Sequence, residues 1–209
     1  MQVYEIFRSL QGETSRAGVP MDFVRLAGCD LACTYCDTPA ARDASAGREM
    51  SAREVLAALP SPPLPWIAIT GGEPLLQLDD VNALIAALAG TGRRVLVETC
   101  GSHSVEALDE RAVRVLDVKT PGSGMAERMD RTNLVRLRPG DEVKFVLTDR
   151  TDYDWAWRVV DRHDLCARAV VLMGPARPHL DAKTVAEWIL ADGRPIRLNL
   201  QIHKDAGLR

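Results

Sequence analysis

The sequence contains no apolar run that approaches the roughly 20 residues of a membrane span. Its first residues, MQVYEIFRSLQGE, lack the basic segment and the apolar segment that together mark a secretory signal. Lysine and arginine are scattered rather than clustered and the net charge is −3, so nothing favours binding to a nucleic-acid backbone or to an anionic membrane. We therefore expect a cytoplasmic protein that acts on a small molecule, with neither nucleic acid nor membrane among its partners.

No stretch of the chain has the composition of a linker between two domains. Its 209 residues are 46% hydrophobic and 26% charged, a balance typical of a globular protein with one sizeable core. We predict a single domain over residues 1–209. The five cysteines are an odd number, and three of them crowd together at Cys29, Cys33 and Cys36, which makes a poor disulfide framework. Metal or cluster binding explains these cysteines better.

Short β-branched runs alternate with segments of helical spacing along the chain. The predicted strands are 21–28, 66–70, 93–99, 113–119, 142–148, 168–173 and 196–203. The predicted helices are 51–60, 78–90, 104–111, 151–164 and 181–193. Such alternation implies parallel βαβ units, and about six repeats fall short of the roughly 250 residues of a complete eight-fold barrel. We therefore predict an α/β fold, an open and partial TIM-like β/α barrel.

The unusual residues of the chain fall directly after predicted strands. These segments are the cysteine loop after 21–28, GGEP after 66–70, ETCGS at the end of 93–99, DVKTPGSG at the end of 113–119, and QIHK at the end of the last strand. Folds of this kind gather their working groups in loops at the carboxyl ends of the strands. We therefore expect all five segments to lie on one rim.

Cys29, Cys33 and Cys36 have the spacing C-x3-C-x2-C, which lets one loop wrap three thiolates around a single centre. Thiolates are soft ligands that suit zinc or an iron–sulfur cluster. A structural zinc site is closed by four protein ligands, and no histidine or further cysteine follows nearby in the sequence. Three thiolates on a [4Fe–4S] cluster would leave one iron open. The spacing favours the cluster, and a zinc knuckle completed by a distant residue remains the alternative.

This loop, with Tyr35 before its last cysteine, resembles the signature loop of the radical SAM enzymes. The resemblance implies a [4Fe–4S] cluster on Cys29, Cys33 and Cys36 whose open iron chelates S-adenosylmethionine (SAM). TGGEP after the second barrel strand adds independent weight, because such a loop holds the amino group of SAM in these enzymes. Gly71 and Gly72 would let the backbone approach SAM closely, and the Glu73 carboxylate would meet its ammonium group.

Seven stretches together resemble the 7-carboxy-7-deazaguanine synthase family, nearly from end to end: EIFRSLQGE, FVRLAGCDLACTYCDT, TGGEPLLQ, ETCGS, DVKTPGSGM, DEVKFV and QIHK. The resemblance implies a radical SAM lyase that converts 6-carboxy-5,6,7,8-tetrahydropterin to 7-carboxy-7-deazaguanine with loss of ammonia, in queuosine and 7-deazapurine biosynthesis. It further implies a homodimer, Mg²⁺ as a cofactor, and a flavodoxin- or ferredoxin-like electron donor.

The resemblance also implies roles for individual residues around the substrate. Thr38 would be the Mg²⁺ ligand, and Arg25 would lie near the substrate carboxylate, where a guanidinium fork fits. The remaining expected substrate contacts are Leu10, Gln11, Gly12, Glu13 and Thr70. Taken without the family, Thr38 is an ordinary turn or cap residue, QGE is a polar turn and Arg25 is a strand residue that faces water.

Several expected cofactor contacts come from strand ends, and here the chain departs from its relatives. Gly72, Glu98, Asp117 and Lys119 would help to hold SAM, with a simple ion pair as the rival explanation for Asp117 and Lys119. Many relatives read SPK where this chain reads DVK. Cys100 replaces the usual Ser, Asn or Gln after ET, and we interpret it as a small polar substitute rather than a fourth cluster ligand.

The carboxyl-terminal tail, HKDAGLR, also differs from that of the relatives. The terminal carboxylate of Arg209 would substitute for the one that reaches the substrate in the family. His203 would contact the substrate or carry a proton near neutral pH, with a hydrogen-bonded structural histidine as the alternative.

Two other functions compete with this hypothesis. A glycyl-radical-enzyme activase shares the small size and the cysteine spacing, although LQGE and DVKTPGSG speak against it. A zinc-stabilised binding protein without radical chemistry is the alternative from another class.

Overall fold

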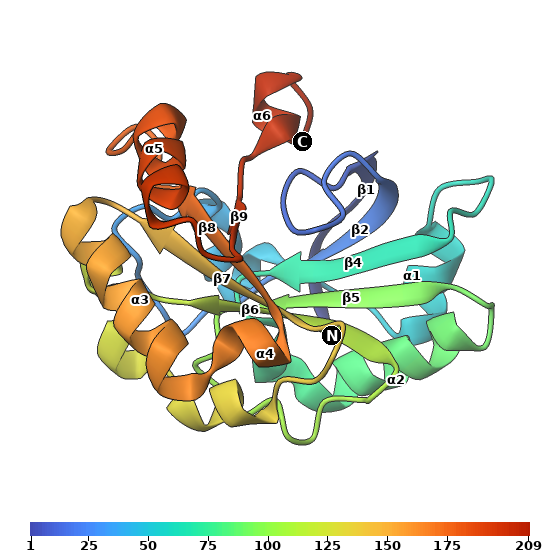
Figure 1. Ribbon diagram of the computed structural model, residues 1–209. Coiled ribbons are helices and arrows are strands. Elements are labelled where there is room, and N and C mark those ends of the chain that lie inside the picture. Colours follow the sequence, from blue (N-terminus) through green and yellow to red (C-terminus); the bar gives the residue numbers. More distant parts are fainter.

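The computed structural model describes residues 1–209 and contains one nine-stranded sheet with the strand order β3-β1-β2-β4-β5-β6-β7-β8-β9 (Figure 1). The strands are β1 (Gln2–Leu10), β2 (Pro20–Leu26), β3 (Arg48–Glu49), β4 (Trp66–Gly71), β5 (Arg94–Thr99), β6 (Ala112–Val118), β7 (Glu142–Leu147), β8 (Val170–Pro175) and β9 (Arg197–Leu198). The α-helices are α1 (Ala52–Ala58), α2 (Leu78–Ala89), α3 (Arg150–His163), α4 (Leu165–Arg168), α5 (Ala182–Asp192) and α6 (Ile202–Asp205). Short 3-10 helices are η1 (Pro39–Arg42), η2 (Ala44–Ala46), η3 (Pro74–Gln77), η4 (Pro121–Ser123), η5 (Ala126–Arg128) and η6 (Arg131–Arg136).

From β2 through β4 to β9 every neighbouring pair of strands is parallel, whereas β1 runs antiparallel to both β2 and β3. The two outermost strands, β3 and β9, do not pair with each other, so the sheet stays open. The prediction of an α/β fold with an open, partial barrel is therefore confirmed. Parallel strands also place their carboxyl ends at one edge, which is the edge where the site must be sought.

The central strands are apolar on both faces, because both faces are covered. On β4, Ile67 and Ile69 belong to a core of 33 buried residues, while Ala68 between them belongs to a smaller cluster of six on the opposite face. The smaller cluster includes Phe7 and Phe23, whose rings stack with centroids 5.0 Å apart. Figure 1 shows α2 and α3 below the sheet in this view, and α5 and α6 above it.

Most of the predicted helices form where they are expected, and their first residues explain why. Ser51 and Glu54 make a reciprocal capping box at the start of α1. Asp149 caps α3 by accepting from the Asp152 amide, and Asp181 caps α5 by accepting from the Thr184 amide. Gly193 ends α5 in a left-handed conformation with a φ of 59°.

The predicted helix over 104–111 is wrong, because the structure has only turns there. The backbone amides of this segment find partners outside a helix. The Val105 amide donates to the side chain of Asn133, and the Asp109 amide donates to the side chain of Asn82. Val105 and Leu108 are nevertheless buried, so the apolar spacing reports burial and not a helix.

The predicted strand over 196–203 is also wrong in extent. Pairing with β8 covers only Arg197–Leu198, and Ile202–Asp205 forms the helical turn α6. The chain leaves the sheet at Asn199, whose side chain accepts from the Thr14 amide, and the Ile202 amide then donates to the carbonyl of Gly12. Contacts with residues near the amino terminus therefore end this strand.

Strand β1 was not among the predicted elements, although it is the longest strand. A register shift between Val3 and Glu5 interrupts the alternation of buried and exposed side chains that marks a strand in a sequence. Its antiparallel pairing with β2 places Leu10 opposite Pro20, at the amino end of β2, and the LQGE segment reaches the other strands from there.

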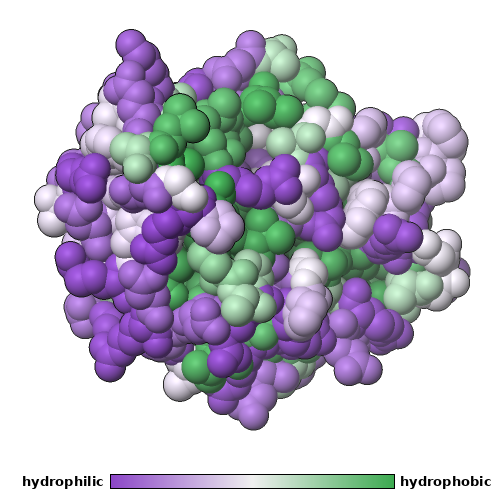
Figure 2. Space-filling view, in the orientation of Figure 1, coloured by the Kyte–Doolittle hydropathy of each residue, from purple (hydrophilic) through white to green (hydrophobic).

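No helix is both long enough and apolar enough to cross a membrane. In Figure 2, hydrophilic residues dominate the left and lower margins of the surface, and apolar residues are visible between them toward the middle.

Candidate active site

A cavity of about 230 Å³ lies at the carboxyl ends of the parallel strands. All five segments that the sequence places on one rim contribute to its lining, as does LQGE from the end of β1. The predicted site residues in the lining are Leu10, Gln11, Gly12, Glu13, Arg25, Cys29, Cys33, Tyr35, Cys36, Thr38, Thr70, Gly71, Gly72, Glu98, Asp117, Lys119, His203 and Arg209. Among the predicted site residues, only Glu73 does not line this cavity.

The cysteine loop is tied to its surroundings at its start and in the middle. At its start, the Cys29 amide donates to the Arg42 carbonyl at 3.0 Å, which links the loop to η1. In the middle, the Thr34 amide donates to the Ser123 carbonyl at 3.1 Å, and the Thr34 hydroxyl donates to the Gly122 carbonyl at 2.8 Å. The loop is therefore held by η4, and its three thiols are placed at the cavity by backbone contacts that need no ligand.

The three loop thiols, Cys29, Cys33 and Cys36, all line the cavity. Thiolates are soft ligands, and three of them can bind three irons of a [4Fe–4S] cluster while the fourth iron has no protein ligand. The donor set therefore fits such a cluster.

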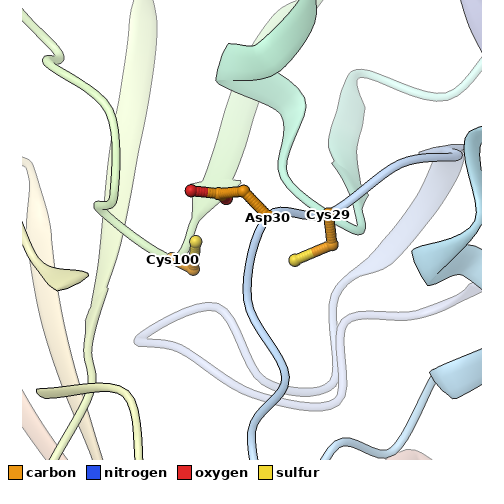
Figure 3. A group of neighbouring side chains, drawn as sticks. All are labelled: Cys29, Asp30 and Cys100. Carbon is orange, nitrogen blue, oxygen red and sulfur yellow. The ribbon is translucent and has the colours of Figure 1, made fainter.

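A fourth thiol lies beside the loop. The sulfurs of Cys29 and Cys100 and a carboxylate oxygen of Asp30 all lie within 4.8 Å of one another, and Figure 3 shows the Cys29 sulfur pointing toward Cys100, which comes from a separate loop. The Cys100 thiol lowers the pKa of Cys29 to about 7, although burial acts in the opposite direction. From the sequence, Cys100 and Cys29 have no visible relation, because 70 residues and three strands separate them.

The GGEP turn packs tightly against the start of the cysteine loop. A Cβ at Gly72 would lie 2.1 Å from the carbonyl oxygen of Gly28 and 2.9 Å from the Cβ of Cys29. Gly71 has a φ of +146°, and a Cβ there would lie 2.3 Å from the Leu26 carbonyl oxygen. Both glycines are therefore required by the approach of two backbones, whatever they contact inside the cavity.

The Glu73 carboxylate lies among protein donors, and its expected contact with the ammonium group of SAM stays a prediction. Glu73 is completely buried, and its carboxylate points into the protein. It accepts hydrogen bonds from the Thr99 hydroxyl and the Cys100 amide, both at 2.7 Å, and from the Leu75 amide at 2.8 Å. Glu73 thus joins the turn after β4 to the loop after β5 and positions both of them.

Asp117, Lys119 and Lys144 form a buried ionic network on the cavity floor. Asp117 Oδ2 lies 3.1 Å from Lys119 Nζ and 3.2 Å from Lys144 Nζ, so the ion pair that rivalled a cofactor role does exist. The second carboxylate oxygen, Oδ1, is buried without any hydrogen-bond partner. Burial works against the charge of Asp117, but the two lysines outweigh it and lower its pKa. Asp117 therefore stays ionised and has one free acceptor.

Glu13 lies at the other end of the same network. Its Oε2 accepts from Lys144 Nζ at 2.6 Å and from Asn199 at 3.3 Å, and its Oε1 accepts from Gln201 at 2.7 Å. Burial alone would raise the pKa of Glu13, but the charge of Lys144 lowers it overall. Because a carboxylate oxygen accepts up to two hydrogen bonds, Oε1 retains one free position.

Gln11 and Glu98 connect this network to β4 and β5. Gln11 Nε2 donates to Glu98 Oε1 at 3.0 Å, and the Thr70 hydroxyl approaches Glu98 Oε2 at 3.5 Å. Burial raises the pKa of Glu98, and the neighbouring charge of Glu13 acts in the same direction. The cavity therefore holds two ionised carboxylates on Lys144 and a third carboxyl group that is more easily protonated.

Arg25 and Thr38 meet at the mouth of the cavity. Arg25 Nη1 lies 3.4 Å from the Thr38 hydroxyl, while Arg25 Nε donates to Glu5 at 2.9 Å. The Thr38 hydroxyl donates to Asp37 at 3.1 Å, and Asp37 is paired with Lys204 at 2.9 Å. The protein thus offers a hard oxygen donor at Thr38, beside a carboxylate whose charge Lys204 already balances.

The carboxyl-terminal tail closes over the LQGE segment. A Cβ at Gly12 would lie 1.5 Å from His203 Nδ1, so only glycine leaves room for the imidazole ring. His203 Nδ1 has no hydrogen-bond partner, and burial lowers the pKa of this histidine, which favours the neutral ring at pH 7. Arg209 folds back to β1, where its guanidinium donates to Glu5 at 2.9 Å and its main-chain oxygen accepts from Ser9 at 2.6 Å.

Lys144, Asn199 and Asp37 are among the cavity residues that the sequence analysis did not single out. Lys144 had a detectable signal, because it stands among the apolar residues of EVKFVL, and a lysine in a covered strand needs a buried partner. Asn199 and Asp37 had none, since their importance comes from the partners that the fold brings to them.

Comparisons with known proteins agree with this site. Residues 24–119 match the Radical SAM superfamily. Three relatives named 7-carboxy-7-deazaguanine synthase align with this chain over nearly its whole length. The protein of Koribacter versatilis is 38% identical to this chain, and the alignment covers 98% of this chain and 96% of the relative. The proteins of Chlorobaculum tepidum (37% identical, covering 98% and 93%) and Methanospirillum hungatei (39% identical, covering 100% and 86%) are similar to the same degree.

The solved structure of QueE from Escherichia coli matches with a TM-score of 0.77 at 23% identity, over 96% of this chain and 93% of that one, which supports the fold. The superfamily implies a [4Fe–4S] cluster and SAM, and neither the activase nor the zinc-protein alternative is favoured. With relatives this similar over nearly the whole chain, this protein belongs to the 7-carboxy-7-deazaguanine synthase family of radical SAM enzymes.

Proposed function

We propose that this protein converts 6-carboxy-5,6,7,8-tetrahydropterin to 7-carboxy-7-deazaguanine with loss of ammonia. The family and the name of its relatives support this reaction. The observation that carries it is the lining of one cavity, which brings together the cysteine loop, the LQGE segment and the carboxylates of Glu13 and Glu98. One side of the cavity can thus hold the cluster and SAM, while the other side offers donors and acceptors to a pterin.

Cys29, Cys33 and Cys36 would hold the cluster, and their place together in the cavity lining supports this assignment. When bound, the cluster and SAM supply a 5′-deoxyadenosyl radical that takes a hydrogen atom from the substrate. Asp117 Oδ1, buried and without a partner, offers an acceptor to a hydroxyl or ammonium group of SAM. Lys119, which stands 5.9 Å from the Tyr35 ring centroid, keeps Asp117 ionised beside the cysteine loop.

The pterin edge would be bound by Gln11, Glu13 and Glu98. Glu13 keeps its charge through Lys144 and has one free acceptor position for a ring N–H. Glu98, whose pKa is raised, can donate from its protonated form to a ring nitrogen or a carbonyl. Arg25 would take the substrate carboxylate, because its Nη1 has only a long contact of 3.4 Å with Thr38.

Mg²⁺ would bind beside Thr38. The hydroxyl is a hard oxygen ligand of the kind that Mg²⁺ accepts, and the substrate carboxylate and water would supply most of the remaining ligands. Arg25 and Lys204 are the nearest cations, so the site would attract Mg²⁺ well only after a carboxylate has entered. Substrate affinity should therefore rise with Mg²⁺ concentration, and Thr38→Val should remove this dependence.

The remaining parts of the proposal concern partners and location. A homodimer and a flavodoxin- or ferredoxin-like electron donor follow from the family resemblance, because the cluster must be reduced by another protein. Cytoplasmic location is supported by the free thiols, which a reducing compartment keeps available to iron.

The test is an anaerobic incubation of the reconstituted protein with SAM, a reductant, Mg²⁺ and carboxytetrahydropterin, followed by product analysis. Deazaguanine product supports the proposal, and its absence in a protein that carries a full cluster refutes it. The purified protein should be brown, with broad absorbance near about 400 nm from the iron–sulfur chromophore. A colourless protein that contains zinc would instead restore the zinc alternative.

A further inference from the structure

Cys29 and Cys100 form a pair of thiols that the proposed reaction does not use as a pair. Their sulfurs lie within 4.8 Å of each other, although Cys29 follows β2 and Cys100 follows β5 (Figure 3). The Cys100 sulfur has a further polar neighbour in the Ser102 hydroxyl at 3.3 Å, and Ser102 in turn donates to Asp30.

The fold holds the two backbones beside each other through one buried residue. The Glu73 amide donates to the Gly28 carbonyl at 2.8 Å, immediately before Cys29, and its carboxylate accepts from the Cys100 amide at 2.7 Å. Glu73 therefore fixes the distance between the two loops. The sulfurs, which lie within 4.8 Å of each other, must close to about 2.05 Å for a bond to form, and this requires rotation about the Cα–Cβ bonds.

Both thiols also line the cavity, so a small oxidant that enters it can reach them. Cys29 is partly exposed, whereas Cys100 is only 8% exposed. An incoming reagent therefore meets Cys29 first, and Cys100 lies behind it as the second thiol. This order is the one that a two-step exchange requires.

We propose that Cys29 and Cys100 are a redox-active pair that forms a disulfide when the cluster is absent, with a low-molecular-weight disulfide as the oxidant. The Cys29 thiolate attacks the small disulfide, forms a mixed disulfide and releases one small thiol. Cys100 then loses its proton and attacks the Cys29 sulfur, which releases the second small thiol and leaves the Cys29–Cys100 bond. Two electrons pass from the protein to the oxidant, and two protons leave the protein thiols.

The bond has a direct consequence for the cluster site, because oxidised Cys29 cannot bind iron. Cluster assembly would wait until a dithiol reductant cleaves the bond. This loss of iron binding is reversible. The disulfide also protects both sulfurs from oxidation to sulfinic and sulfonic acids, which thiols cannot reduce. The pair would therefore link cluster assembly to the redox state of the cell, independently of the reaction that the cluster supports.

The competing bond joins Cys33 and Cys36 within the loop. These two residues share a tight turn in which the Cys36 amide donates to the Cys33 carbonyl at 3.2 Å. The two outcomes differ in mass, because trypsin leaves all three loop cysteines in the peptide 26–42 and Cys100 in the peptide 95–111. A Cys29–Cys100 bond joins these peptides, whereas a bond inside the loop leaves 26–42 alone and about 2 Da lighter.

The experiment treats cluster-free full-length protein with oxidised glutathione, then blocks free thiols and maps peptides without reduction. We expect free thiols to fall from five to three per chain, and we expect fragmentation of the joined peptide to locate the bond on Cys29 and not on Cys33 or Cys36. Cys166→Ser is the matched control, because Cys166 lies at α4 outside the cavity, and it should still give the joined peptide. Cys100→Ser should give none.

Iron uptake provides a second readout. After the glutathione treatment, wild-type protein should take up iron and sulfide only once dithiothreitol has been added, while Cys100→Ser should need less reductant. Reduced Cys100→Ser should load as much iron as wild type, which shows that the variant is folded. If it does not load, the peptide map of wild type alone decides. A peptide 26–42 that is oxidised internally, without the joined peptide, overturns the proposal.

Discussion

Replacing Lys144 with methionine should destabilise the protein more than any exposed lysine can. Lys144 lies between two carboxylates, at 2.6 Å from Glu13 and 3.2 Å from Asp117, and its side chain is only 9% exposed. Methionine keeps most of the volume and removes the charge. Asp117 retains Lys119 as a partner, but Glu13 keeps only the amides of Asn199 and Gln201.

The expected magnitude follows from leaving a buried carboxylate without its cation. Breaking a buried ion pair by removing one partner costs about 3–5 kcal/mol. With a urea m-value of about 2 kcal/mol/M, the unfolding midpoint should fall by about 1.5–2.5 M. Urea titration followed by circular dichroism measures this change. Lys183→Met is the control, because Lys183 is 84% exposed and its midpoint should hardly move.

The cost should also depend on pH in a defined direction. In the folded wild type the pKa values of Glu13 and Asp117 are both lowered from their ordinary values of 4.5 and 3.8. Their ionisation therefore stabilises the fold above those values, and this contribution is lost as pH falls through the folded pKa values. Without Lys144, burial raises the pKa of Glu13. The difference in unfolding free energy between wild type and variant should therefore be largest at pH 7 and should shrink as the pH falls toward 4.5. A loss below about 1 kcal/mol that does not change with pH would refute the reasoning.

Three further predictions concern the cluster, the turn that holds it and the tail. Cys36→Ala should lose the iron and the broad absorbance near about 400 nm, while Cys166→Ala keeps both; iron analysis decides this. In the wild type, backbone amides donate to the Glu73 carboxylate, and Glu73→Gln places an amide group against these donors. The substitution should lower the free energy of unfolding by about 2–3 kcal/mol and the melting temperature in calorimetry by about 4–12 °C. An unchanged melting temperature would contradict this. Gly12→Ala should displace His203 and raise amide hydrogen exchange in α6, and exchange equal to wild type would show that the contact is unimportant.

The sequence alone determined the fold class, the family and the kind of chemistry. These properties rest on local signals: the spacing of three cysteines in one loop, β-branched runs of strand length, and glycine-rich turns that follow them. Most of the predicted strands and four of the five predicted helices have their counterparts in the structure, because their caps and apolar runs are adjacent in sequence. The exceptions, 104–111 and 196–203, are segments whose backbone partners lie far away along the chain.

Only the tertiary structure decided which side chains meet. It placed Cys100 beside Cys29, buried the Glu73 carboxylate among backbone donors, and set Lys144 between Asp117 on the neighbouring strand and Glu13, which lies far away along the chain. A sequence pattern reports spacing along one segment, whereas a hydrogen bond or an ion pair depends on a distance between segments that pack together only in the fold. The cysteine loop could therefore be identified from its own sequence, but the presence of the Cys100 thiol beside Cys29 could not.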